Sequence, residues 1–250
     1  MRVAAVYDIH GNLPALDAVL REIEQESVDL ILVGGDIVWG PFPRETLDIL
    51  LRLDRARFIR GNADREVATR LDTAADGLED DITAAINIWA ADQLTEEDSE
   101  WLSGLETTFA AEVDDLGEVL FCHGSPRSDE EVITLLSPPE RLRDALRVRQ
   151  HTIVCGHTHM QFQRNLGNHY VVNAGSVGMP YEGRPGAYWA LLGPRVDLRR
   201  TDYNVDAAVD AMERTTCPHV QEVFIDTILH PPSADDVARQ FEAIALDKTY

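Results

Sequence analysis

Short apolar segments that end in glycines and polar residues constrain the fold of this chain more than any other feature. Three of them lie in the first 65 residues, and they cover residues 3–7, 30–33 and 57–59. Between them, apolar side chains such as Leu16, Val19 and Ile23 recur at helical spacing. This repeated strand–loop–helix order predicts an α/β fold, in which the carboxyl ends of the strands share one edge of a sheet.

The rest of the chain changes character twice. Residues 66–104 are acidic and are predicted to be helical, with Ile82, Ile86 and Trp89 on one face. Residues 204–250 predict two or three helices with a break at Pro231-Pro232. We therefore expect a core of residues 1–202, with a second mixed sheet packed on the first, and a C-terminal helical appendage of residues 203–250 packed on that core. The strands expected after Thr107 are residues 119–122, 153–155, 160–165, 169–173, 186–192 and 195–201.

Composition limits the partners and the location of the protein. The chain has 250 residues and a net charge of −22, which repels nucleic-acid backbones and anionic membranes, so we expect neither as a stable partner. A small phosphorylated substrate stays possible, because a bound cation can reverse the local field. No apolar run exceeds six residues and Asp8 interrupts the first one, so we expect no membrane span, no signal peptide and a cytoplasmic location.

Five predicted strand ends carry side chains of the kind that bind metal ions. Each block is weak evidence alone, because a Gly-Asn pair is usually a turn and a lone histidine usually has a structural role. Together they are informative, because all five fall at carboxyl ends that one sheet system can bring together. The blocks are Asp8-Ile9-His10-Gly11-Asn12, Gly34-Gly35-Asp36, Gly61-Asn62-Ala63-Asp64, Cys122-His123-Gly124 and Gly156-His157-Thr158-His159.

The chemistry of these side chains indicates divalent ions. Imidazole, carboxylate and amide oxygen suit Mn, Fe, Zn or Ni, and the absence of cysteine from the set argues against a structural zinc site. Asp8 and His10 are two residues apart, so they would share a face of an extended strand. Two ions that share a carboxylate can bridge a hydroxide and hold both sides of a displacement at phosphorus. The candidate ligands are Asp8, His10, Asp36, Asn62, His123, His157 and His159.

In their order along the chain, these blocks resemble the calcineurin-like metallophosphoesterases, whose pattern is D-x-H, GD, GN, H and GHxH. The resemblance covers residues 1 to about 200 and is closest to the small bacterial and archaeal phosphodiesterase branch. It implies a four-layer αββα sandwich with two mixed sheets, and two divalent ions, manganese first, with Fe, Zn, Ni and Mg as alternatives. The first ion would be held by Asp8, His10, Asp36 and His159, and the second by Asp36, Asn62, His123 and His157.

One position departs from the pattern of many relatives, in which a histidine follows the GN asparagine. Here that residue is Ala63, which disfavours the mechanisms of protein phosphatases. Asp64 keeps its position but lacks the usual histidine partner, so a structural role is expected for it. The catalytic group is then Asp36 as the bridge, with Asn62 and His123 positioning the phosphate.

The resulting prediction is a metal-dependent phosphoric ester hydrolase, most simply a phosphodiesterase of small esters or nucleotides. The alternatives are a dinucleoside polyphosphate hydrolase, a Ser/Thr protein phosphatase, or an inert metal-binding scaffold. Two further residues are candidate substrate ligands, and for each of them a structural role is an equally good interpretation. Asn12 could donate to a substrate oxygen or cap a turn, and Arg127 could bind the phosphate or form a surface ion pair.

Overall fold

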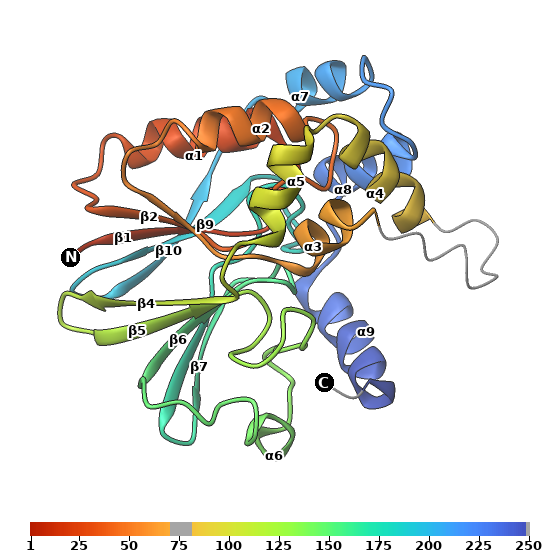
Figure 1. Cartoon of the computed structure of the whole chain (residues 1–250). Helices are drawn as coiled ribbons and strands as arrows, with labels where there is room; N and C mark the ends of the chain where they lie inside the picture. Colours follow the sequence, from red (N-terminus) through yellow and green to blue (C-terminus); the bar gives the residue numbers. More distant parts are fainter. Residues whose placement is uncertain (71–81, 249–250) are drawn as a thin grey trace.

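The computed structural model describes residues 1–70 and 82–248. Their strands form two mixed five-stranded sheets that pack face to face (Figure 1). The first sheet has the order β10-β9-β1-β2-β3, and the second β4-β5-β6-β8-β7. The strands of the first sheet are β1 (Val3–Val6), β2 (Leu30–Val33), β3 (Ala56–Phe58), β9 (Ala187–Leu192) and β10 (Val196–Thr201). Those of the second are β4 (Thr108–Val113), β5 (Gly117–Cys122), β6 (Thr152–Cys155), β7 (Phe162–Leu166) and β8 (His169–Asn173).

Strand β1 lies at the centre of the first sheet and is buried on both faces. It pairs in parallel with β2 and antiparallel with β9. Its side chains alternate between two cores, as the period of a strand requires. Ala4 and Val6 pack towards the helices, whereas Val3 and Ala5 pack between the two sheets. The continuous apolar run of the sequence is thus explained by burial on both faces.

Helices cover the outer face of the first sheet (Figure 1). Leu16 of one helix and Leu47 of the next belong to the same buried cluster as Val6. Pro43 begins the second helix, where its missing N–H and fixed φ suit the first turn. The helices that precede β4 are α1 (Leu13–Ile23), α2 (Pro43–Leu50), α3 (Asn62–Ala68), α4 (Ile82–Asp92) and α5 (Glu96–Ser103).

The outer face of the second sheet is covered mainly by irregular chain between residues 123 and 151, with one short helix, α6 (Pro139–Leu142). Ile133 and Leu142 from this segment pack on Leu120 and Ile153 of the sheet. The expected α/β fold with two mixed sheets is therefore confirmed, although the fourth layer is largely coil.

The C-terminal segment contains α7 (Val205–Met212), a π-helical turn (Val220–Ile225), α8 (Asp226–Leu229) and α9 (Ala234–Asp247). The first three pack with Ile86 of α4 in one apolar cluster. Helix α9 packs elsewhere, against Met160 and Tyr181. The break predicted at Pro231-Pro232 thus separates two places of attachment, while the division of the chain at residue 202 stays a prediction.

The helical prediction for residues 66–104 is met in part, by α3, α4 and α5. Residues 71–81 of that range lie outside the described residues. Ile86 is buried, but Ile82 is 37% exposed, so the expected apolar face is incomplete at its first position. Among the described residues, no helix is long and apolar enough to cross a membrane.

Candidate metal centre

The candidate site lies where β1, β2, β5 and β6 end at a common edge of the two sheets. The loops that follow these strands are bent by residues in the left-handed region, with φ of 52° at Asp8, 47° at His10 and 54° at Asp36. Strand β1 already ends at Val6. The expectation that Asp8 and His10 share the face of an extended strand is therefore wrong. A turn brings the two side chains together instead, with the His10 N–H donating to the carbonyl of Asp36 (2.9 Å).

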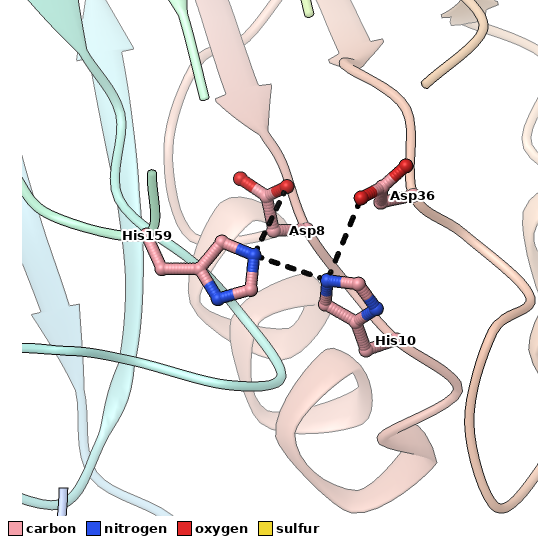
Figure 2. A group of neighbouring side chains, drawn as sticks. All are labelled: Asp8, His10, Asp36 and His159. Carbon is pink, nitrogen blue, oxygen red and sulfur yellow. Dashed lines mark hydrogen bonds and ion pairs between the residues drawn. The ribbon is translucent and has the colours of Figure 1, made fainter. Parts of the chain in front are cut away.

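One group of side chains joins Asp8, His10, Asp36 and His159, with one candidate ligand atom of each within 4.8 Å of the others (Figure 2). The Nε2 atoms of His10 and His159 are 3.1 Å apart. Nε2 of His159 lies 3.4 Å from Oδ1 of Asp8, and Nε2 of His10 lies 3.7 Å from Oδ2 of Asp36. Two carboxylates and two imidazoles thus converge on one small volume.

A second group joins Asp36, His123 and His157 within the same distance limit. Nε2 of His123 lies 3.3 Å from Oδ2 of Asp36. The rings of His123 and His157 meet edge to face, with centroids 5.2 Å apart. Asp36 is the one member of both groups, so the geometry allows this carboxylate to serve two ions.

The backbone sets the orientation of three imidazoles. In each of them Nδ1–H donates to a main-chain carbonyl, so Nε2 is turned inwards, as is usual for metal-binding histidines. In His10 and His159 the Nε2 lone pairs face each other, an arrangement that a cation between them stabilises. The acceptors are the carbonyls of Trp39 for His10 (3.2 Å), Gly34 for His123 (2.9 Å) and Met179 for His159 (2.8 Å).

Unsatisfied polar atoms support the same interpretation. The buried atoms without a hydrogen-bond partner among the described residues include three from the candidate ligands, Oδ1 of Asp8, Oδ1 of Asn62 and Nε2 of His123. Buried polar atoms are normally paired, because leaving one unpaired costs about 1–3 kcal/mol. All three are lone-pair donors of the kinds that bind divalent ions. The donor set therefore fits the metal ions that the sequence implied.

Charges within the cluster shift the pKa values of its members in opposite directions. Burial would raise the pKa of Asp36, but the adjacent His123 imidazole lowers it well below its usual range. Burial would lower the pKa of His123, but the carboxylates of Asp36 and Asp8 outweigh this and raise it to about 10. The position of His123 thus favours positive charge, which a divalent cation would supply in place of the proton.

The other two shifted histidines are held neutral. Burial and the nearby His159 ring lower the pKa of His10 to about 4. Burial and the charge of His123 likewise lower the pKa of His157 to about 4. Neutral imidazole is the form that binds metal ions, so these rings need no deprotonation at neutral pH.

Gly61 allows the close approach on which the Asp36 carboxylate depends. A Cβ atom at position 61 would lie 2.1 Å from Oδ1 of Asp36. The same oxygen accepts a hydrogen bond from the Ala63 N–H (2.8 Å). The residues at the start of α3 therefore hold Oδ1 of Asp36, while Oδ2 faces His10 and His123.

Asp64 has a structural environment, as the sequence predicted for it. Its carboxylate accepts hydrogen bonds from the N–H groups of Ile37 (2.7 Å), Asp36 (2.8 Å) and Gly61 (3.1 Å). Burial and the nearby Asp36 charge raise its pKa to about 7 against these donors. Asp64 thereby ties the β2 loop to the start of α3. The neighbouring Ala63 is buried and has no group that could transfer a proton.

The two candidate substrate ligands are engaged within the protein. Asn12 caps α1 through Ala15 N–H (3.3 Å) and donates to the carbonyl of Gly178 (3.0 Å). Arg127 makes a two-point ion pair with Glu131 (2.6 and 2.8 Å). These contacts favour the capping and ion-pair readings, and substrate contact by either residue stays a prediction.

Two aromatic residues near the cluster were missed by sequence reasoning. Tyr181 stacks on His159 with ring centroids 4.7 Å apart, and Phe241 of α9 lies 6.2 Å from the ring of His157. Neither residue belongs to a motif, and Phe241 is more than 80 positions from the nearest ligand in the sequence. Only the packing of α9 reveals this proximity.

Comparison with known proteins decides the family. The calcineurin-like phosphoesterase superfamily domain matches residues 1–193. The chain belongs to this superfamily. An uncharacterised protein of Methanocaldococcus jannaschii is 26% identical over 235 residues, covering 86% of this chain and 93% of its relative. The match to the superfamily domain ends at residue 193, so the C-terminal helices lie outside the matched region.

Two solved structures share the fold. A hypothetical protein from Pyrococcus horikoshii superposes with a TM-score of 0.78 at 21% identity, covering 93% of this chain and 99% of that one. A metallophosphoesterase from Sphaerobacter thermophilus gives 0.71 at 24% identity, with 92% and 99% covered. These two structures share the architecture over more than nine-tenths of this chain.

Proposed function

We propose that this phosphoesterase is a dinuclear metal-dependent phosphodiesterase that hydrolyses small phosphate diesters. The observation that carries the proposal is the membership of Asp36 in both groups of candidate ligands. One shared carboxylate, with imidazoles on either side of it, is the arrangement that two adjacent divalent ions need. Manganese is the proposed metal, and iron, zinc, nickel and magnesium are the alternatives.

The proposed ligands divide between the two groups as the motifs imply. Asp8, His10 and His159 would hold the first ion with Asp36, while Asn62, His123 and His157 would hold the second with it. Bound divalent ions activate water at neutral pH and stabilise the charge that develops at phosphorus. The chain contributes the orientation of the ligands through the carbonyl-bound imidazoles. Asn62 and His123 are also proposed to position the phosphate.

The intact donor set argues against an inert scaffold. A chain that served only as a scaffold would be expected to lose ligands, yet all seven candidate ligands are present. Ala63 argues against a protein phosphatase, because that mechanism relies on the histidine absent here. A phosphodiesterase with acidic leaving groups needs no such acid.

Metal stoichiometry and hydrolysis together test the proposal. Purified protein saturated with manganese should bind about two ions per chain and hydrolyse bis-p-nitrophenyl phosphate. His10→Ala and His123→Ala should each bind about one ion and lose most of the activity. His230→Ala, at an exposed histidine, is the matched control and should resemble wild type. At most one ion in wild type, with both ligand variants unchanged, would contradict the dinuclear proposal.

A further inference from the structure

A cavity of about 240 Å³ lies beside the metal centre, between α9 and the loop that precedes β9. An apolar cavity of roughly 150 Å³ is enough to bind benzene, whereas complete ligand sites usually exceed about 300 Å³. The cavity therefore has the size for one ring system, as part of a larger ligand. Its lining consists of Tyr181, Pro232, Val237, Gln240, Phe241 and Ile244.

The walls of this cavity contact the metal centre directly. Tyr181 stacks on His159 with an interplanar angle of 26°, and Phe241 lies against His157. The two aromatic rings are 6.5 Å apart, centroid to centroid. The histidines do not line the cavity themselves, so a group bound in it would lie one aromatic side chain away from them.

The wall formed by α9 is held in place by polar contacts from the residue next to Phe241. The Glu242 carboxylate accepts hydrogen bonds from Thr134 (2.7 Å), Ser137 (2.5 Å) and Arg141 (3.0 Å). These partners come from the segment that covers the second sheet. Two adjacent residues of α9 therefore have different roles. Glu242 holds the helix in place, and Phe241 faces the histidines. The cavity is consequently preformed.

We propose that this cavity binds a planar aromatic group of the phosphodiester, either a nucleobase or an aryl ring. Aromatic side chains bind such groups by stacking, and the Gln240 amide adds one donor and one acceptor for the edge of a base. The occupant is taken to be joined to the phosphate, so this inference rests on the proposed function. The assignment makes α9, outside the superfamily domain, a determinant of specificity.

Three phosphodiesters with the same leaving group separate this role from the chemistry. They are bis-p-nitrophenyl phosphate, thymidine 5′-p-nitrophenyl phosphate and methyl p-nitrophenyl phosphate, which differ in the group that stays on phosphorus. For wild type with manganese, kcat/KM should be higher by about tenfold for the aryl or the nucleoside ester than for the methyl ester. Phe241→Ala and Phe241→Leu should both reduce that ratio to near one, and leucine keeps the helix packed.

Two further variants identify the source of the ring and control for the helix. Gln240→Ala should lower the ratio of nucleoside to methyl ester if the occupant is a base, and leave the ratio of aryl to methyl ester unchanged. Arg239→Ala, at an exposed position of α9, should leave both ratios as in wild type. An equal fall for all three esters in Phe241→Leu would mean a structural role for α9 and would overturn the proposal.

If no ester is hydrolysed, the proposed phosphodiesterase activity is wrong. A binding measurement still tests the aromatic subsite in that case. Calorimetric titration of manganese-loaded protein should show AMP binding about tenfold more tightly than ribose 5-phosphate. Phe241→Leu should abolish that difference. Equal affinities of wild type for the two compounds would refute the aromatic subsite.

Discussion

The ligand cluster and the α9 wall lie side by side, yet they are built in opposite ways. The ligands follow buried strands, and main-chain hydrogen bonds orient them, as between His123 and Gly34. Helix α9 follows a proline break and is attached by side chains, chiefly Glu242. The cluster lies within the superfamily domain, whereas α9 lies beyond it. Under the two proposals, the type of reaction depends on the strand-end cluster, and the choice of ester depends on α9.

The two regions also differ in their energetic demands. Gathering Asp8 and Asp36 in a buried site is unfavourable without compensating positive charge. The α9 wall buries mostly apolar surface and carries its charged anchor at the periphery, where Glu242 is 18% exposed. The stability of the ligand cluster should therefore depend on metal binding, while the stability of the α9 wall should depend on apolar packing.

The largest expected effect comes from the cluster, at Asp36. Asp36→Asn removes a negative charge shared by both proposed ions and should lower kcat by at least about a thousandfold, since several kcal/mol of charge stabilisation are lost. His159→Ala, which affects one proposed ion, should cost less. Steady-state kinetics with bis-p-nitrophenyl phosphate measures both, with Asp210→Asn as the exposed control. Near-normal turnover of Asp36→Asn would remove Asp36 from the bridging role.

A second prediction tests whether the cluster lacks an acid for the leaving group. A positioned acid contributes about 10²–10⁴-fold, and Ala63 cannot supply it. Diesters with acidic phenols should therefore react at least about a hundredfold faster than alkyl diesters. The measurement is kcat for diesters whose leaving groups have graded pKa values. A flat series with chemistry rate-limiting would show that another acid acts, and Asp64 would be the first to examine.

A third prediction concerns the anchor of the wall. Glu242→Ala should weaken the attachment of α9, because it leaves the Arg141 guanidinium without its carboxylate. The strand-end loops should stay folded. We expect faster amide hydrogen exchange in α9, corresponding to a loss of about 1–3 kcal/mol of local stability. The β1 and β2 amides should be unaffected, and Arg239→Ala is the control on the same helix. Equal loss of protection in β1 would mean that cluster and wall unfold together.

The smallest expected effect lies where the two regions join, at Glu182. Burial raises its pKa to about 7, and the Gln161 N–H that donates to it acts against this rise. Because the folded pKa lies above the unfolded value of about 4.3, the native state loses stability as the pH rises from about 4 to 7. Glu182→Gln should therefore stabilise the protein by about 1 kcal/mol at pH 8 and hardly at pH 4. Thermal unfolding at the two pH values checks this, and an equal shift at both would contradict it.

Most of the fold could be predicted because its strands are short, apolar and bounded by glycines. Strand β8 has the predicted ends, and β9 and β10 each begin one residue later than expected. The candidate ligands could be named for the same reason, since each follows a short strand, although β3 before Asn62 is only partly buried. The local conformation could not, because the left-handed turns at Asp8 and His10 depend on hydrogen bonds to a loop that is distant in the sequence.

The roles of polar residues outside the motifs were open in the sequence and depend on their partners. Asn12 caps a helix and Arg127 pairs with Glu131, and each chemistry would equally suit a phosphate. The chemical type of a side chain shows what it can bind, and the residues packed around it determine what it binds in the folded protein. Those residues come from other segments of the chain, which a local sequence pattern does not identify.

By itself, the sequence determined the two-sheet fold class and the set of metal-type side chains, because alternation, glycine and residue chemistry are local properties. Only the tertiary structure decided that Asp36 lies in both groups, that three imidazoles turn Nε2 inwards, and that Phe241 reaches His157. These relations depend on distances between segments up to about 150 residues apart, which packing sets and no spacing along the chain encodes.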